Sequence, residues 1–351
     1  MCSSDLERLS CVGCHESRLR TPANAGRAFP LAAGREPSAI TPFAGFPDVI
    51  DFNGDIQPIL DRHCVECHSF ARREGHISLV GDLGPLYSHS FYALFAHRQV
   101  ADGRNGLGNQ PPRSLGTSAS ALMKKIDGSH HDVKLDPGEQ RTVWLWIESS
   151  SPYAGTYAAL RNAEEQVQVK PDLVFSSQKP VLERRCAACH SIDNPNDASR
   201  MPLPFVPERQ ERRRAANRPT GEYERVVLPD DPLARFSVHL LVNLSHPENS
   251  PLLLGPLARD AGGFGSCGDV FKDKEDPDYK SLLAAIADCK ARSDTQPRFG
   301  TPGFRPNRQY IREMKKYGVL SADFDAATGT LDPFQTDQAY WRGAHAAAPP
   351  K

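Results

Sequence analysis

The sequence predicts a mainly α-helical, loop-rich protein. Its 30 prolines lie mostly between segments of helical periodicity, so we expect short helices joined by long ordered loops and little sheet. Two segments open with an Asp-Pro pair, which places a capping residue before a proline in the first helical turn. With 351 residues, the chain is long enough for two or three domains with sizeable cores.

The first predicted folding unit covers residues 49–165. It begins with a short helix over residues 55–63. It closes with a helix in which Asp136 is the N-cap, Pro137 holds the first helical position and Glu139 completes a capping box. We expect the first and last helices to pack across each other and close the unit.

The closing helix carries an apolar stripe at Val143, Trp144 and Ile147. We expect at least one of Trp144 and Trp146 to be an ordinary core residue.

The second predicted unit covers residues 166–295 and is an enlarged copy of the first. Near its end, Asp276 and Pro277 predict the start of another helix. The expected buried face of this helix consists of Leu282, Leu283 and Ile286. Residues 296–351 form a predicted helical tail, with an amphipathic helix in 305–320 and a further turn in 332–342.

Residues 1–48 are expected to be the end of a truncated upstream region. The start, MCSSDLERLS, has neither the basic residues nor the apolar stretch of a signal peptide. The run CSSDL matches one reading frame of a common sequencing adaptor, so we expect the natural protein to extend further upstream.

The pattern Cys-x-x-Cys-His occurs three times, and it is the attachment signature of haem c. Two thiols bond to the two vinyl groups of the porphyrin, and the adjacent imidazole binds the iron from the proximal side. The sequence therefore predicts three covalent haem c groups on tandem cytochrome-c-like domains. The attachment residues are Cys11, Cys14, Cys64, Cys67, Cys186 and Cys189, and the proximal ligands are His15, His68 and His190.

Zinc sites and redox dithiols are the alternatives. A zinc ribbon or finger needs two thiol or imidazole pairs at short spacing. Here the three motifs are far apart in the chain, and each has its own histidine, which favours haem.

The second and third motifs share an upstream arm. DIQPILDRHCVECHS (residues 55–69) matches SQKPVLERRCAACHS (residues 177–191) position by position, which indicates an internal duplication. The first motif lacks this arm, so we expect it to close an earlier domain.

The second axial position of each iron decides the function of the haem. Methionine there raises the potential, but we expect Met123 to be a core residue. The candidate distal ligands are His130 and His131 for the second haem and His239 and His246 for the third, with solvent-facing or hydrogen-bonded histidine as the alternative. An iron without a distal ligand leaves a position open for a substrate.

Outside the motifs, Cys267 and Cys289 form a disulfide or remain buried thiols, and the sequence leaves both possibilities open.

The formal net charge of -1 argues against nucleic acid as a partner. No apolar run approaches the length of a membrane span. Haem attachment of this kind takes place in an oxidising compartment, so we expect a periplasmic or otherwise extracytoplasmic protein.

The chain resembles the middle and following haem-binding region of the hydrazine synthase alpha subunit family, and more closely the related multihaem c-type cytochromes of planctomycete-type bacteria. The strings that carry the resemblance span most of residues 50–345: DIQPILDRHCVECH, GSHHDVKLDPGEQRTVWLWIESSSPYAGTY, QKPVLERRCAACH, HPENSPLLLGPLARDAGGFG, DPDYKSLLAAI and RPNRQYIREMKKYGVL. It implies covalent haem c, a helical fold rich in loops, redox partner proteins and an upstream β-propeller. Arg72, four residues after His68, offers no iron ligand, so the reaction of the synthase is not carried over.

These observations predict an extracytoplasmic multihaem c-type cytochrome that transfers electrons. The alternative is a haem enzyme, an oxidoreductase acting on small nitrogen species or peroxide at one five-coordinate haem. A third possibility is a structural haem module that docks an attached propeller to a partner. No catalytic residue is assigned.

Overall fold

The structure is a computed structural model. It describes residues 35–36, 45–47, 49–85, 87–101, 111–159, 172–190, 238–295, 299 and 303–346. The chain divides into two compact units, Met1–Ala44 and Gly45–Lys351. Every element named below belongs to the second of these units.

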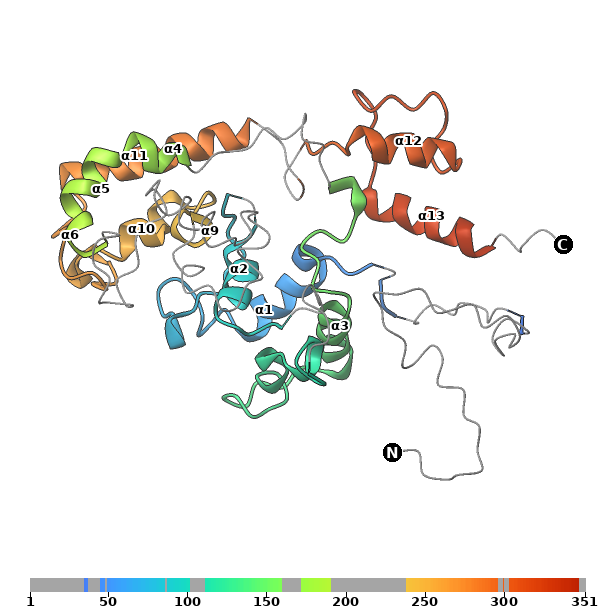
Figure 1. Ribbon diagram of the computed structural model, residues 1–351, viewed down its shortest axis with the longest axis horizontal. Coiled ribbons are helices and arrows are strands. Elements are labelled where there is room, and N and C mark those ends of the chain that lie inside the picture. Colours follow the sequence, from blue (N-terminus) through green and yellow to red (C-terminus); the bar gives the residue numbers. More distant parts are fainter. Residues whose placement is uncertain are drawn as a thin grey trace, which may run out of the picture. The chain divides into compact units, whose positions relative to one another are not determined.

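The described residues are rich in helix and contain no strand, only isolated bridges, which confirms the predicted mainly α class. The first part of the chain holds η2 (Phe52–Ile56), α1 (Gln57–His63), η3 (Glu74–His76), α2 (His89–Ala96), η4 (Gly116–Ser118), η5 (Ala121–Lys124), α3 (Pro137–Glu148) and η6 (Tyr157–Ala159). The middle part holds α4 (Asp172–Ser177), α5 (Lys179–Arg185), α6 (Ala187–His190), α9 (Val238–Leu241), η8 (Pro247–Asn249), α10 (Pro251–Leu254), η9 (Arg259–Ala261) and α11 (Pro277–Asp294). The tail holds α12 (Arg308–Lys316) and α13 (Pro333–Ala346) (Figure 1).

Helix α2 lies at the centre of the first core, and all of its residues are buried. The hydroxyl of Ser88 caps it by accepting a hydrogen bond from the backbone N–H of Phe91. The ring of Phe91 lies 5.0 Å from that of Phe52 and 6.4 Å from that of Trp146, measured between centroids. This helix was not predicted from the sequence, because the run FYALFA has no polar face to reveal a helical period.

Both closing helices begin as predicted. Asp136 accepts from the backbone N–H of Glu139, and the carboxylate of Glu139 accepts in return from the N–H of Asp136, so α3 has a complete capping box. Asp276 caps α11 by accepting from the backbone N–H groups of Asp278 and Tyr279. Each cap satisfies backbone donors that have no partner inside the helix.

The apolar face of α3 differs from the predicted stripe at one residue. Val143 and Ile147 are buried as expected, but Trp144 is 37% exposed and Trp146 is fully buried. Trp146 lies three residues after Val143 and therefore shares its face, whereas Trp144 lies to one side. The indole N–H of Trp146 donates to the carbonyl of Pro152 at 2.9 Å, which satisfies its polar atom.

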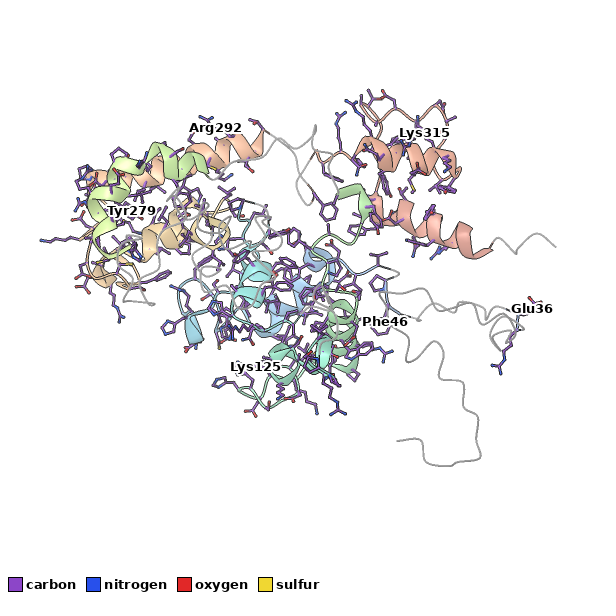
Figure 2. All side chains as sticks on the ribbon, viewed as in Figure 1. Glu36, Phe46, Lys125, Tyr279, Arg292 and Lys315 are labelled. Atoms are coloured by element: carbon purple, nitrogen blue, oxygen red, sulfur yellow. The ribbon has the colours of Figure 1, made fainter. Side chains whose placement is uncertain are left out.

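The second core forms where α4 and α5 pack along α11 (Figure 1). Leu282 and Ile286 are buried and Leu283 is partly buried, so the predicted face of α11 is confirmed. Tyr279 lies within this core, whereas Arg292 at the far end of the same helix is exposed (Figure 2).

A link joins residues 82–89 to residues 242–246. The backbone N–H of Leu244 donates to the carbonyl of Leu83 at 2.7 Å. The carboxylate of Asp82 accepts from the side-chain amide of Asn243 at 2.7 Å and lies 3.0 Å from Nδ1 of His246. These contacts hold the parts of the chain that carry the second and third motifs against each other.

The tail forms a third, smaller core. Tyr310, Ile311 and Met314 of α12 are buried together with Ala158 of η6, so the tail packs against η6. The amphipathic helix predicted in this region is confirmed as α12. The further turn predicted in 332–342 is in fact a helix of 14 residues, α13.

Candidate functional site

The second and third motifs fold into the same single turn. In each, the backbone N–H groups of the second cysteine and of the histidine donate to the carbonyl of the first cysteine. The distances are 3.2 and 2.9 Å in residues 64–68 and 3.1 and 2.9 Å in residues 186–190. In both copies the N–H of the first cysteine donates at 2.8 Å to the carbonyl of the leucine four residues earlier. The two thiols and the imidazole therefore belong to one helical turn, as porphyrin attachment requires.

The arm of the second motif is tied to α3 through Glu139. Arg62 donates to this carboxylate through Nη2 at 2.7 Å, and Nε2 of His63 lies 2.9 Å from its other oxygen. Burial raises the pKa of Glu139, but the hydrogen bonds from Arg62 and His63 outweigh burial and bring this pKa below its usual value. The ion pairs fix the end of α1 immediately before Cys64.

The arm of the third motif is tied to α11 in the same way. Arg184 and Arg185, which match Arg62 and His63 in the duplication, both pair with Asp278, at 2.6 and 2.7 Å. Arg185 also reaches Asp276 at 2.9 Å. These contacts were not predicted from the sequence. The available signal was the basic pair before each first cysteine together with an acidic first turn in each closing helix.

The ring of His130 lies opposite that of His68. Their centroids are 6.2 Å apart, and their planes are within 16° of parallel. A nitrogen bound to a metal at about 2 Å places the imidazole centre about 3 Å from it, so two imidazoles on opposite sides of one metal have centres about 6 Å apart. The structure thus brings a predicted proximal histidine and a predicted distal histidine close together, at a distance between ring centres that is compatible with a shared metal.

The surroundings of this pair fit a bound group. Nδ1 of His68 is buried and has no hydrogen-bond partner, which is uncommon for a polar atom unless a water or ligand is missing. Burial and the nearby Lys125, His131 and His68 lower the pKa of His130, which favours the neutral imidazole that binds metals. His131 is exposed and lies with its ring 4.7 Å from that of His130. Met123 is partly buried and packs against the first core.

The first cysteine of each described motif is a protonated thiol at neutral pH. Burial, and to a smaller extent Cys67, raise the pKa of Cys64 to about 11. Burial, and to a smaller extent Cys267, raise the pKa of Cys186 to about 11.

Cys267 lies close enough to the third motif to affect its thiols. It interacts electrostatically with Cys186, and burial together with Cys189 raises the pKa of Cys267 itself. No disulfide joins the six cysteines that the structure describes, so the pair Cys267–Cys289 is absent.

The remaining predicted site residues are only partly described. Cys11, Cys14 and His15 lie outside the described residues, as does the side chain of His239. His190 is partly buried. Nδ1 of His246 lies 3.0 Å from the carboxylate of Asp82, and the hydrogen bond that this carboxylate accepts raises the pKa of His246. A carboxylate on one ring nitrogen is also the usual support for a histidine that binds metal through the other.

A small cavity of about 240 Å³ lies beside the second motif. Its wall includes Arg73, three histidines and Ser78, whose buried hydroxyl has no hydrogen-bond partner. The guanidinium of Arg73 lies 3.9 Å from the centre of the Phe264 ring. Donors and positive charge of this kind suit an acidic group, such as the propionates that haem carries.

Family models, curated proteins and solved structures were compared with the chain, and none of them matches it. In the described ranges, no helix combines the length and apolar character required to cross a bilayer. In the same ranges, no group of three or more His, Cys, Asp or Glu side chains is arranged to hold a bare metal ion.

Proposed function

We propose that the protein is an extracytoplasmic multihaem c-type cytochrome that transfers electrons, with haem c attached at each of the three motifs. The observation that carries the proposal is the distance of 6.2 Å between the ring centres of His68 and His130, where His68 belongs to the same turn as Cys64 and Cys67. The repetition of that turn at residues 186–190, with matching hydrogen bonds, supports the same role there.

Each residue has a defined part in this proposal. Cys64 and Cys67 would attach the porphyrin, and His68 and His130 would be the two iron ligands from this chain. When bound, haem c supplies an iron that gains and loses one electron. Glu139 fixes the arm through Arg62 and His63, so the ligands move little when the charge of the site changes.

The proposal extends to the fold and to partners. The two arms tied to two closing helices support tandem cytochrome-c-like domains. The resemblance to the hydrazine synthase alpha subunit and its multihaem relatives supports a periplasmic location, redox partner proteins and an attached β-propeller. It supports no particular reaction.

The test is the mass of the denatured protein after expression in a host with a cytochrome-maturation system. The expected result is the mass of three haem groups added to the polypeptide. Replacing Cys64 and Cys67 together by alanine should remove the mass of one haem. The matched control, Cys289→Ala, changes a cysteine outside the motifs and should remove none.

A protein that carries no covalent haem in such a host contradicts the proposal. Zinc found by elemental analysis in that haem-free protein would assign the motifs to metal binding instead. Covalent haem that exchanges no electrons with any external donor would contradict the electron-transfer role while leaving the cofactor in place.

A further inference from the structure

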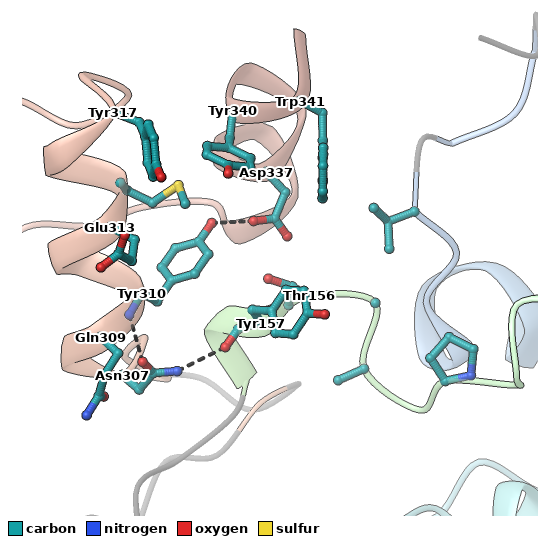
Figure 3. Close-up of a pocket in the computed structure, with 15 residues that line it drawn as sticks. Thr156, Tyr157, Asn307, Gln309, Tyr310, Glu313, Tyr317, Asp337, Tyr340 and Trp341 are labelled. Carbon is teal, nitrogen blue, oxygen red and sulfur yellow. Dashed lines mark hydrogen bonds between the residues drawn. The ribbon is translucent and has the colours of Figure 1, made fainter. Parts of the chain in front are cut away.

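A cavity of about 820 Å³ lies away from the described cysteine motifs, where residues 152–157 meet α12 and α13 (Figure 3). Its volume is within the range of small-molecule sites. Its walls combine aromatic rings with two carboxylates, and no lysine, arginine or histidine is among the described residues that line it.

The rings stand at steep angles to one another. Tyr317 and Tyr340 have centroids 5.3 Å apart and planes at 72°, and Tyr340 and Trp341 have centroids 5.2 Å apart and planes at 74°. Tyr157 contributes another ring from η6, on the other side of the cavity (Figure 3). Rings set at steep angles around one cavity form the kind of cage in which an alkylated ammonium group binds by cation–π attraction to ring faces.

A carboxylate without a counter-charge lies in the same cavity. Asp337 is 8% exposed, and its side chain accepts a hydrogen bond from the hydroxyl of Tyr310 at 2.6 Å. No basic side chain in the described part of the chain forms an ion pair with Asp337. Glu313, the second carboxylate of the wall, already pairs with Arg312 and Lys316. A buried carboxylate is normally paired, so the charge of Asp337 is available to a bound cation.

We propose that this cavity binds a small organic cation of the alkylated ammonium class, with Asp337 as the counter-charge and Tyr157, Tyr340 and Trp341 as the cage. An inorganic divalent cation is a poorer occupant, since it needs several oxygen ligands at short distance and the walls offer mostly rings. This site is independent of the haem proposal.

The test is isothermal titration of the full chain with choline. The control ligand is the uncharged carbon isostere of choline, in which a tert-butyl group replaces the trimethylammonium group. We expect choline to bind with a Kd of about 1 mM or below and the isostere to bind at least about tenfold more weakly. Sodium chloride at the same concentration should produce no binding heat.

Two variants assign the binding to this cavity. Asp337→Asn removes the charge, and Trp341→Leu removes a ring that is 40% exposed and takes no part in the buried hydrogen bond between Tyr310 and Asp337. Each should weaken choline binding about tenfold. The control is Trp144→Leu, because Trp144 is 37% exposed, close to the 40% of Trp341, and lies outside the cavity.

Three results would overturn the proposal: no choline binding, equal binding of choline and its isostere, or unchanged binding in Trp341→Leu. If Asp337→Asn does not fold, the ring variant and the isostere still decide the outcome. None of these measurements depends on haem content, so failure here leaves the proposed function untouched.

Discussion

At the scale of single residues, the proposed function makes His130 the distal ligand of the second haem. Replacing it by asparagine removes the imidazole that faces His68 at 6.2 Å. The expected result is a change of one haem from six-coordinate to five-coordinate, seen as new high-spin absorption and as binding of carbon monoxide to one haem in the reduced protein.

The matched control for His130 is His131→Asn. His131 has a φ of 47°, in the left-handed region that asparagine tolerates well, so the loop should keep its shape. This variant should keep the spectrum of the unmodified protein. If His131→Asn opens the haem and His130→Asn does not, the two histidines have exchanged roles and the pairing of His68 with His130 is wrong.

Cys267 leads to a second prediction at this scale. In protein produced without haem and then oxidised, we expect Cys267 to form a disulfide with Cys186 or Cys189, because its thiol lies near enough to theirs to affect their pKa values. Peptide mapping by mass spectrometry identifies the pair. Finding Cys267 bonded to Cys289 would contradict the arrangement in the structure and restore the pairing that the sequence left open.

Most of the candidate site could be predicted from sequence at the residue scale, because attachment depends on neighbours in the chain. Cys64, Cys67 and His68 belong to one turn, so their spacing alone predicts that the two thiols and the imidazole lie together. Glu139 could not be assigned in this way. It is 77 residues from Arg62, and only the packing of two helices brings the two together.

At the scale of elements, helix starts were predictable and buried helices were not. Asp136 and Asp276 carry local capping signals, and both helices begin there. Helix α2 has a buried face on every side, so its sequence shows no period. The wrong assignment of Trp144 to the buried face of α3 has a similar origin. An aromatic residue that lies beside an apolar stripe can belong to the buried face or to the exposed face.

The tie between α1 and α3 leads to a pH prediction at this scale. The folded-state pKa of Glu139 is lowered, so its charge contributes stability above its unfolded pKa of about 4.5. That contribution is lost as the pH falls through the lower folded value. Glu139→Gln should therefore reduce the free energy of unfolding by about 1 kcal/mol at pH 7.

Thermal unfolding of the unmodified protein and of Glu139→Gln, measured across the acid range, tests this prediction. The two melting temperatures should differ at pH 7 and approach each other below pH 4. Glu183→Gln is the control, because Glu183 pairs with Lys179 on the exposed surface of α5, where ion pairs contribute little. A difference that persists unchanged at low pH would show that the side chain acts through shape and not through charge.

At the scale of the whole chain, the same local arrangement of an arm, a turn and ion pairs occurs twice. A short arm carries a thiol–imidazole turn, and its last two basic residues pair with the acidic start of a closing helix. The duplication of residues 55–69 and 177–191 predicted the arms. It did not predict the link through Asp82, since that link joins residues outside the repeated segments.

The link itself is expected to weaken as the pH rises. Asp82 raises the pKa of His246, mainly through their hydrogen bond and then through its charge. A raised folded pKa means that the stabilisation is fully present below the unfolded pKa of about 6.5 and is lost as the pH rises through the folded value.

His246→Gln should thus lower the melting temperature at pH 6 and have little effect at pH 9. His76→Asn, at an exposed histidine that forms no ion pair in the described part of the chain, should show no such pH dependence. The opposite trend, a stability difference that grows with pH, would contradict the ion pair, and it would support the prediction that neutral His246 binds the iron of the third haem.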